Sequence, residues 1–149
     1  MTPLREAALA AVPARLAAAV PDAVTERARR APVDTDAEVL PRLVVTGADW
    51  TADTTQQPGA THYTIGFDVV GYAGGATDLA AEQAVSSLHA AVVVALAGWT
   101  PDAAGLSDVA EDSASFRTYA ADESARPAGA FVARFSLLAV APTGQPTTS

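Results

Sequence analysis

Apolar residues recur at helical spacing over the first twenty positions of the chain. They follow one another at four-residue intervals: Leu4, Ala8, Val12, Leu16 and Val20. This spacing places them on one face of an α-helix. Thr2 offers a hydroxyl N-cap, and Pro3 suits the first helical position. Pro13 lies inside the pattern and removes one backbone donor, so we expect it to kink or split the helix.

The other apolar segments are short or alternate with polar residues, which is the pattern of β-strands. The expected strands are 24–27, 43–45, 61–71, 106–112, 115–119 and 130–140. Gly47 is expected to end the second strand, and the glycines between 71 and 75 to bend the chain. Residues 51–61 are rich in Thr, Gln, Pro and Gly, which predicts a flexible excursion.

A second helix is predicted over residues 78–97, capped by Thr77 or Asp78 and stopped by Gly98. Helices and strands do not alternate one for one, so a doubly wound parallel sheet is not expected. The order predicts an α+β fold, with a mostly antiparallel or mixed sheet and the two main helices packed on one face. The other face would need a cover, for which a neighbouring subunit is suited. We expect one domain over 1–141 and a flexible tail over 142–149.

The chain has a formal net charge of −8 at pH 7 and contains nine arginines but no lysine. This balance argues against wrapping nucleic acid, because phosphate binding depends on Lys and Arg. It would suit a channel through which DNA slides without sticking. Without cysteine, the chain can form no disulfide or thiolate metal site. Because no run approaches the roughly 20 apolar residues of a membrane span, we expect a soluble, intracellular protein.

No motif in the sequence predicts catalysis, a cofactor or a metal. His62 and His89 lack a second ligand at metal spacing. The serines beside His89 fall on other faces of its helix, and no glycine-rich elbow positions them. The glycines of 71–75 lack both phosphate-loop spacing and a P-loop lysine. The acidic residues of 102–123 are interpreted as solvated surface, with the lining of a negative channel as the alternative.

The arginines near the N-terminus form the concentrated positive charge of an otherwise acidic chain. They are either a solvated turn or a contact for an acidic patch on another subunit. Two tryptophans each follow an apolar run, where an aromatic ring is either core rim or interface anchor. The candidate interface residues are therefore Arg27, Arg29, Arg30, Arg42, Trp50 and Trp99.

The order of these blocks resembles the tail terminator, or tail-completion, proteins of long-tailed phages and gene transfer agents. The resemblance rests on the 4–20 helix, the 24–27 strand, Arg30-Ala31-Pro32-Val33-Asp34, Leu40-Pro41-Arg42-Leu43-Val44-Val45, the 63–72 strand leading into Leu88-His89-Ala90, and the 131–140 strand with its proline-rich tail. It covers nearly the whole chain through apolar blocks and not through a catalytic signature.

The resemblance implies a structural virion protein with a helix-on-sheet α+β fold. Its copies would form a homohexameric ring that stops growth of the tail tube and presents a surface to the head connector. The implied partners are further copies, the major tail tube protein and the head–tail connector or stopper protein. DNA would only pass through the lumen, and no membrane is involved. The implied location is the head-proximal end of the virion tail, after assembly in the bacterial cytoplasm.

Three other functions remain open on the sequence. The chain could be another head–tail connector or a minor tail protein, which belongs to the same class. It could also be a small ligand-binding α+β module that forms a dimer or trimer. An enzyme is the least supported, because no residues converge on a site.

Overall fold

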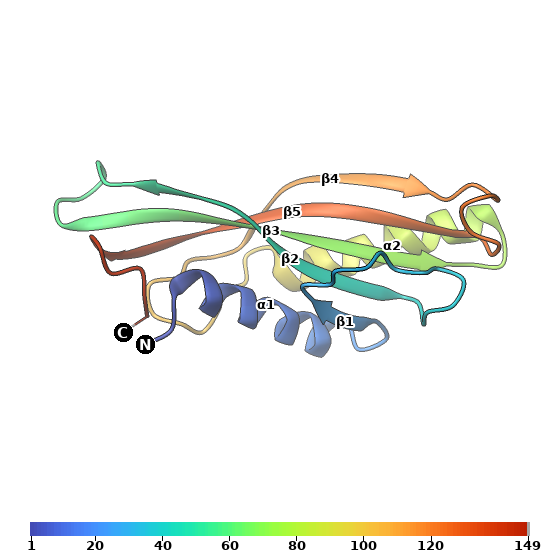
Figure 1. The fold of residues 1–149 in the computed structure, drawn as a ribbon, viewed down its shortest axis with the longest axis horizontal. Helices are drawn as coiled ribbons and strands as arrows, with labels where there is room; N and C mark the ends of the chain where they lie inside the picture. Colours follow the sequence, from blue (N-terminus) through green and yellow to red (C-terminus); the bar gives the residue numbers. More distant parts are fainter. Residues whose placement is uncertain (149) are drawn as a thin grey trace.

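Two helices and five strands make up the computed structural model, which describes residues 1–148 (Figure 1). In chain order they are α1 (Leu4–Ala19), β1 (Val24–Arg27), β2 (Arg42–Asp53), β3 (Ala60–Gly74), α2 (Asp78–Leu96), β4 (Ala110–Thr118) and β5 (Ala128–Pro142). The molecule is elongated along its strands, and the predicted α+β class is confirmed.

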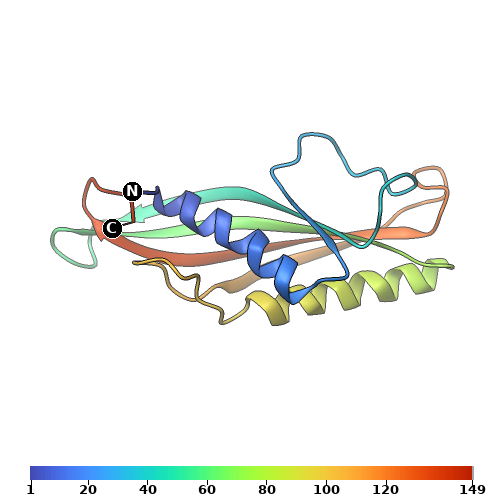
Figure 2. The same ribbon diagram turned by 90° about the horizontal axis from the view of Figure 1, so that it is seen from below.

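The strands form one mixed sheet in the order β1-β2-β3-β5-β4. β1 runs parallel to β2, and every other neighbouring pair is antiparallel. A parallel pair needs a crossover, which here is the 28–41 segment. Figure 2 shows this crossover on the side of the sheet away from α2.

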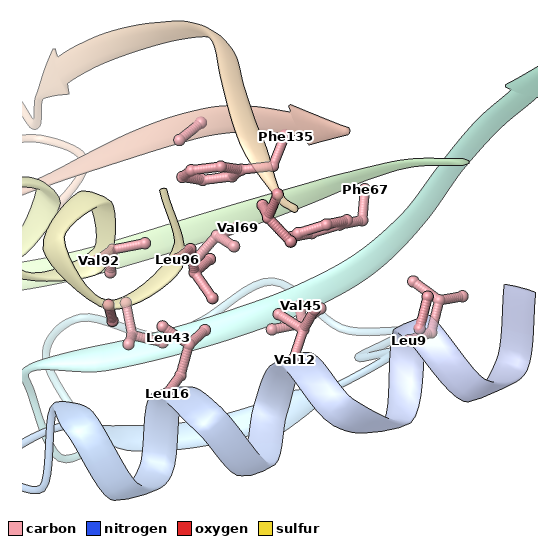
Figure 3. Packing of buried hydrophobic residues seen from close by; sticks show 14 of the residues in the cluster. Leu9, Val12, Leu16, Leu43, Val45, Phe67, Val69, Val92, Leu96 and Phe135 are labelled. Carbon is pink, nitrogen blue, oxygen red and sulfur yellow. The ribbon is translucent and has the colours of Figure 1, made fainter. Parts of the chain in front are cut away.

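The core lies between the sheet and the helices, which pack on one face as the sequence predicted. α1 contacts β1, β2 and β3, whereas α2 contacts β3, β5 and β4. Figure 3 shows Leu9, Val12 and Leu16 of α1 directed at the sheet, where the side chains of Leu43 and Val45 point back. Deeper in the same cluster, Phe67 and Phe135 stack with ring centroids 5.6 Å apart.

The first helix continues through Pro13, so the predicted split is wrong. Leu9, Val12 and Leu16 are buried on both sides of the proline, and their packing outweighs one missing hydrogen bond. The predicted Thr2 cap is also wrong, because Pro3 is the N-cap residue and no side chain of residues 1–148 caps the helix. The start is held instead by a hydrogen bond from the Leu4 N–H to the carbonyl of Pro146, at 3.0 Å.

The second helix begins and ends as predicted. The hydroxyl of Thr77 accepts a hydrogen bond from the Ala80 N–H at 3.1 Å, which is an N-cap contact. At the other end Gly98 has a φ of 78°, a left-handed conformation that glycine adopts without steric cost.

Two glycines that were expected to end or bend strands lie inside strands instead. β2 continues past Gly47 through a β-bulge, and a Cβ at Gly47 would lie 2.2 Å from the Arg5 guanidinium. β3 continues past Gly71, where a Cβ would lie 2.1 Å from the Phe131 ring. Arg5 comes from the helix layer and Phe131 from β5, the strand paired with β3. Both glycines therefore serve close packing and not a turn.

The expected excursion at 51–61 is shorter than predicted, because β2 reaches Asp53 and β3 begins at Ala60. The two strands form a long hairpin (Figure 1). The two weak strands predicted over 106–119 are also corrected: residues 110–118 form one strand, and Leu106 makes only an isolated bridge to Ala139.

The C-terminal segment lies beside the N-terminus (Figures 1 and 2). Thr147 forms a bridge with Pro3, and the Thr148 N–H donates to the carbonyl of Thr2 at 2.7 Å. The flexibility expected for 142–149 stays a prediction, and these are the contacts that such motion would have to break.

Candidate interaction surfaces

The first of the predicted interface arginines is bound within its own chain. Arg27 donates two hydrogen bonds to the carboxylate of Glu6 on α1, at 2.6 and 2.8 Å. This two-pronged geometry is the strong form of an arginine–carboxylate pair. It lowers the pKa of Glu6, chiefly through the hydrogen bond from Arg27. The pair links the edge strand β1 to the helix that covers it.

Arg29 and Arg42 are also engaged by carboxylates. Arg29 donates to Glu38 at 2.6 and 2.7 Å and to Glu26 at 2.9 Å. Arg42 lies 3.0 Å from the same Glu26 carboxylate. The hydrogen bond from Arg29 is the main cause of the lowered pKa of both glutamates. These arginines therefore anchor the crossover between β1 and β2.

Arg30 differs from the other three predicted arginines. Arg30 is exposed, and within residues 1–148 its guanidinium has neither a hydrogen bond nor an ion pair. The cluster is thus mostly neutralised inside the chain, and Arg30 is the member whose charge is available to another molecule. Interface contacts by all four arginines stay a prediction.

Trp50 lies on the β2–β3 hairpin and stacks on Tyr63, with ring centroids 4.4 Å apart and planes 12° apart. Trp50 retains 38 % of its exposure, whereas Tyr63 beneath it is buried. A half-exposed aromatic ring held rigid by a stacked partner is typical of an interface anchor.

Trp99 follows α2 and packs against the hydrophobic core. The Arg15 guanidinium lies 5.7 Å from the centre of its ring and donates to the carbonyl of Ala95 at 3.0 Å. Trp99 and Arg15 therefore join the ends of α1 and α2, which fits the alternative interpretation of this tryptophan as core rim.

A polar cluster that the sequence did not reveal fastens the crossover to the β4–β5 turn. The Asp36 carboxylate accepts hydrogen bonds from the Ala125 and Arg126 N–H groups, at 3.0 and 3.1 Å. These two bonds are the main causes of the lowered pKa of Asp36. Next to it, the buried Thr35 and Ser124 hydroxyls are 2.8 Å apart. No local motif signalled this cluster, because its two halves are about ninety residues apart.

His89 joins α2 to the edge strand β4. Its Nε2 lies 3.0 Å from the Glu111 carboxylate, and its ring meets Phe116 and Phe131 edge-on at 5.0 and 5.2 Å. The interpretation of His89 as a packed residue agrees with these contacts. Within residues 1–148, no cluster of His, Asp and Glu could hold a metal ion.

The face of the sheet opposite the helices is partly open. Asp68 and Arg134 form an ion pair at its centre, and three apolar side chains around it keep substantial exposure: Val132, Leu138 and Val140. Because the helices cover only the other face of the sheet, these apolar side chains stay partly exposed.

By length and composition, α2 would be able to cross a membrane, since it has 19 residues and a mean hydropathy of 1.5. The sequence reading did not anticipate this. Several of its apolar residues belong to the core: Ala81, Val85, Leu88, Val92 and Leu96. The core helix of a globular fold can have the same length and mean hydropathy.

The arrangement defines an α+β protein with two helices on one face of a mixed five-stranded sheet. This fold is similar to that of a chain in the virion of a native gene transfer agent particle, with a TM-score of 0.59 and 16 % sequence identity. The similarity covers 89 % of this chain and 94 % of that one. At this identity the likeness shows a shared fold. No family model and no curated protein matches the sequence.

Proposed function

We propose that this chain is a structural component of a phage-like or gene transfer agent particle. In this proposal a ring of its copies, expected to be a hexamer, terminates and caps the tail tube and joins it to the head connector. The observation that carries the proposal is the fold shared with a gene transfer agent virion chain over most of both molecules.

The surfaces of the chain support an assembly role. The face opposite the helices is partly open, and the exposed Trp50 and Arg30 offer an aromatic anchor and a positive charge that has no ion pair within residues 1–148. Repeating one heterologous contact around an axis closes a ring. Its two rims differ, so one could meet the tube and the other the connector. The net charge of −8 would keep a DNA-conducting lumen from binding phosphate.

Polymerisation of the tail tube protein of the same particle, with and without this chain, tests the proposal. We expect shorter tubes that carry a ring at one end in negative-stain micrographs, and the length should fall as the chain is added. An unrelated acidic protein of similar size is the control. Tubes of unchanged length without a bound ring would contradict the proposal.

A hollow of about 520 Å³ supports a second candidate, the small ligand-binding module. It lies beside α2, and its apolar lining includes Val20, Leu40 and Leu88. Pockets for small ligands have this size and lining. A stable dimer whose melting temperature rises with an apolar ligand, and which leaves tube growth unchanged, would favour this candidate over the ring.

A further inference from the structure

We propose that the two edges of the sheet pair with each other between copies, so that β1 of one copy adds antiparallel to β4 of the next. The inference rests on the proposed ring and names the contact that would close it. Four observations carry it: the open edge of β4, the open edge of β1, their relative direction and the charges at their ends.

The first observation is the open edge of β4. Among the described residues this strand pairs only with β5. The Tyr119 N–H, just after β4, donates to the Ala128 carbonyl at 3.0 Å. Because successive residues of an antiparallel strand direct their backbone groups to opposite sides, Ala114 and Phe116 direct theirs to the open side. The Phe116 side chain is 54 % exposed, so a strand added here would also cover apolar surface.

The second observation is the other end of the sheet, where β1 pairs only with β2 in residues 1–148. The Val24 N–H donates to the Pro41 carbonyl at 3.0 Å, and the Ala28 N–H donates to the Val45 carbonyl at 2.9 Å. By the same alternation, Thr25 and Arg27 direct their backbone groups away from β2. Both edges therefore present unpaired donors and acceptors.

The third observation is direction. One parallel and three antiparallel pairings separate β1 from β4, so the two edges of one sheet run in opposite directions. A second copy placed with its helices on the same side would bring its β1 antiparallel to β4. This contact leaves one free edge at each end and can repeat until a ring closes. Pairing of β4 with β4 would stop at a dimer.

The fourth observation is charge. β4 carries Glu111 and Asp112 near its start and Arg117 near its end. Antiparallel pairing would place the acidic start opposite the arginines that follow β1, where Arg30 has no partner among the described residues. Arg117 would lie opposite the beginning of β1 in the next copy, near Asp22.

Intramolecular contacts already hold three of these groups on β4. Glu111 contacts His89, Asp112 accepts from Ser136, and Arg117 pairs with Glu123. Arg30 would therefore supply the new charge at the contact. Charges on edge strands prevent indiscriminate pairing, and opposite signs at matching ends select one partner.

Engineered cysteines test this contact directly, because the natural chain has none. Val24→Cys on β1 is combined with Ser115→Cys or, for a second register, with Ser113→Cys. The two edges of one sheet lie four strand spacings apart, about 19 Å, which is too far for a disulfide within one chain. Mild oxidation of the assembled protein should therefore yield a ladder of covalent oligomers. A matched control joins Val24→Cys with Val94→Cys on the exposed face of α2.

The outcomes separate this contact from the ring itself. No ladder from either pair overturns the edge contact, and if rings still cap tubes the proposed function stands. A dimer from Ser115→Cys alone would mean that β4 pairs with β4 and would also overturn it. A ladder from a chain that leaves tubes uncapped would uphold the contact and remove the proposed function.

Charge reversal gives an independent test. Arg30→Glu and Asp112→Arg should each weaken association by up to about fivefold, the range of an exposed ion pair. The double variant should recover most of the loss, as measured by sedimentation. A double variant weaker than either single variant would overturn the charge pairing.

Discussion

Arg27 and Glu6 hold the edge strand β1 against α1 through two hydrogen bonds of 2.6 and 2.8 Å. Each side chain is partly exposed, so solvent and salt weaken the attraction. We expect Arg27→Ala to lower the thermal unfolding midpoint slightly at low salt, and by less at high salt. Circular dichroism melts at two salt concentrations measure this. An equal loss in Arg30→Ala would contradict the assignment, because Arg30 has no ion pair among the residues that the structure describes.

Arg29 and Arg30 should respond differently to charge reversal. Arg29→Glu would place a third carboxylate beside Glu26 and Glu38, which Arg29 now neutralises, and we expect this variant to unfold more easily. Arg30→Glu should leave the unfolding midpoint unchanged and weaken only assembly. Urea unfolding and sedimentation of both variants separate the two effects. An unchanged midpoint in Arg29→Glu would mean that this network contributes nothing to stability.

Acid should destabilise the fold through carboxylates whose pKa is lower in the folded state. Arg29 lowers the pKa of Glu26 and Glu38, and the Thr55 hydroxyl is the main cause that lowers the pKa of Asp53 to about 2. Such groups stabilise the fold fully above their unfolded pKa and lose this effect as pH falls through the folded value. We expect stability to be level down to about pH 5 and to decline below about pH 4.5, where unfolded glutamates begin to bind protons.

Urea midpoints measured from pH 7 to pH 2 test this profile. Asp36→Asn provides the comparison, because its carboxylate accepts the backbone hydrogen bonds of the β4–β5 turn. This variant should be less stable at pH 7 and should lose less on acidification. A decline of the same size as in the natural chain would show that Asp36 does not take part.

Phe135 is fully buried and stacks on Phe67. We expect Phe135→Ala to lower the free energy of unfolding by about 3–5 kcal/mol, since a large cavity would open in the core. Val94→Ala is the matched control, because Val94 is 83 % exposed, and it should change stability by less than about 0.5 kcal/mol. Urea unfolding of both variants gives the comparison.

Substitution of Trp99 should affect mainly stability, and substitution of Trp50 should affect mainly assembly. Trp99→Ala removes a ring packed on the core and beside Arg15, so we expect a lower unfolding midpoint. Trp50→Ala removes a half-exposed ring, so it should weaken assembly more than folding. Melting curves and sedimentation of both variants test this. An assembly defect in Trp99→Ala alone would reverse the two roles.

The sequence predicted the elements with strong periodicity and misjudged those that depend on packing. The apolar stripes of both helices and the alternation of β3 and β5 were read correctly, because their spacing is local. The lengths of β2 and β3 were underestimated at Gly47 and Gly71. No residue close to either glycine in the sequence indicates that the side chain of Arg5 lies against Gly47 or that of Phe131 against Gly71.

The sequence predicted which residues of the candidate interface are charged or aromatic, but not which side chains they pair with. The sequence identified the basic cluster, but it could not show that Glu6, Glu26 and Glu38 neutralise most of it. It also offered no sign of the Asp36 cluster. Ion pairs and hydrogen bonds between distant segments depend on which strands become neighbours, and that is not a local property.

By itself, the sequence determined the class of fold, the two helices on one face and the acidic balance, because periodicity and charge are written residue by residue. Only the tertiary structure decided that Arg27, Arg29 and Arg42 form ion pairs within the fold, whereas Arg30 has none among the described residues. It also decided that β1 and β4 are the two open edges. The strand order β1-β2-β3-β5-β4 arises from long-range pairing, so the position of each free edge and each neutralised charge follows from the folded chain alone.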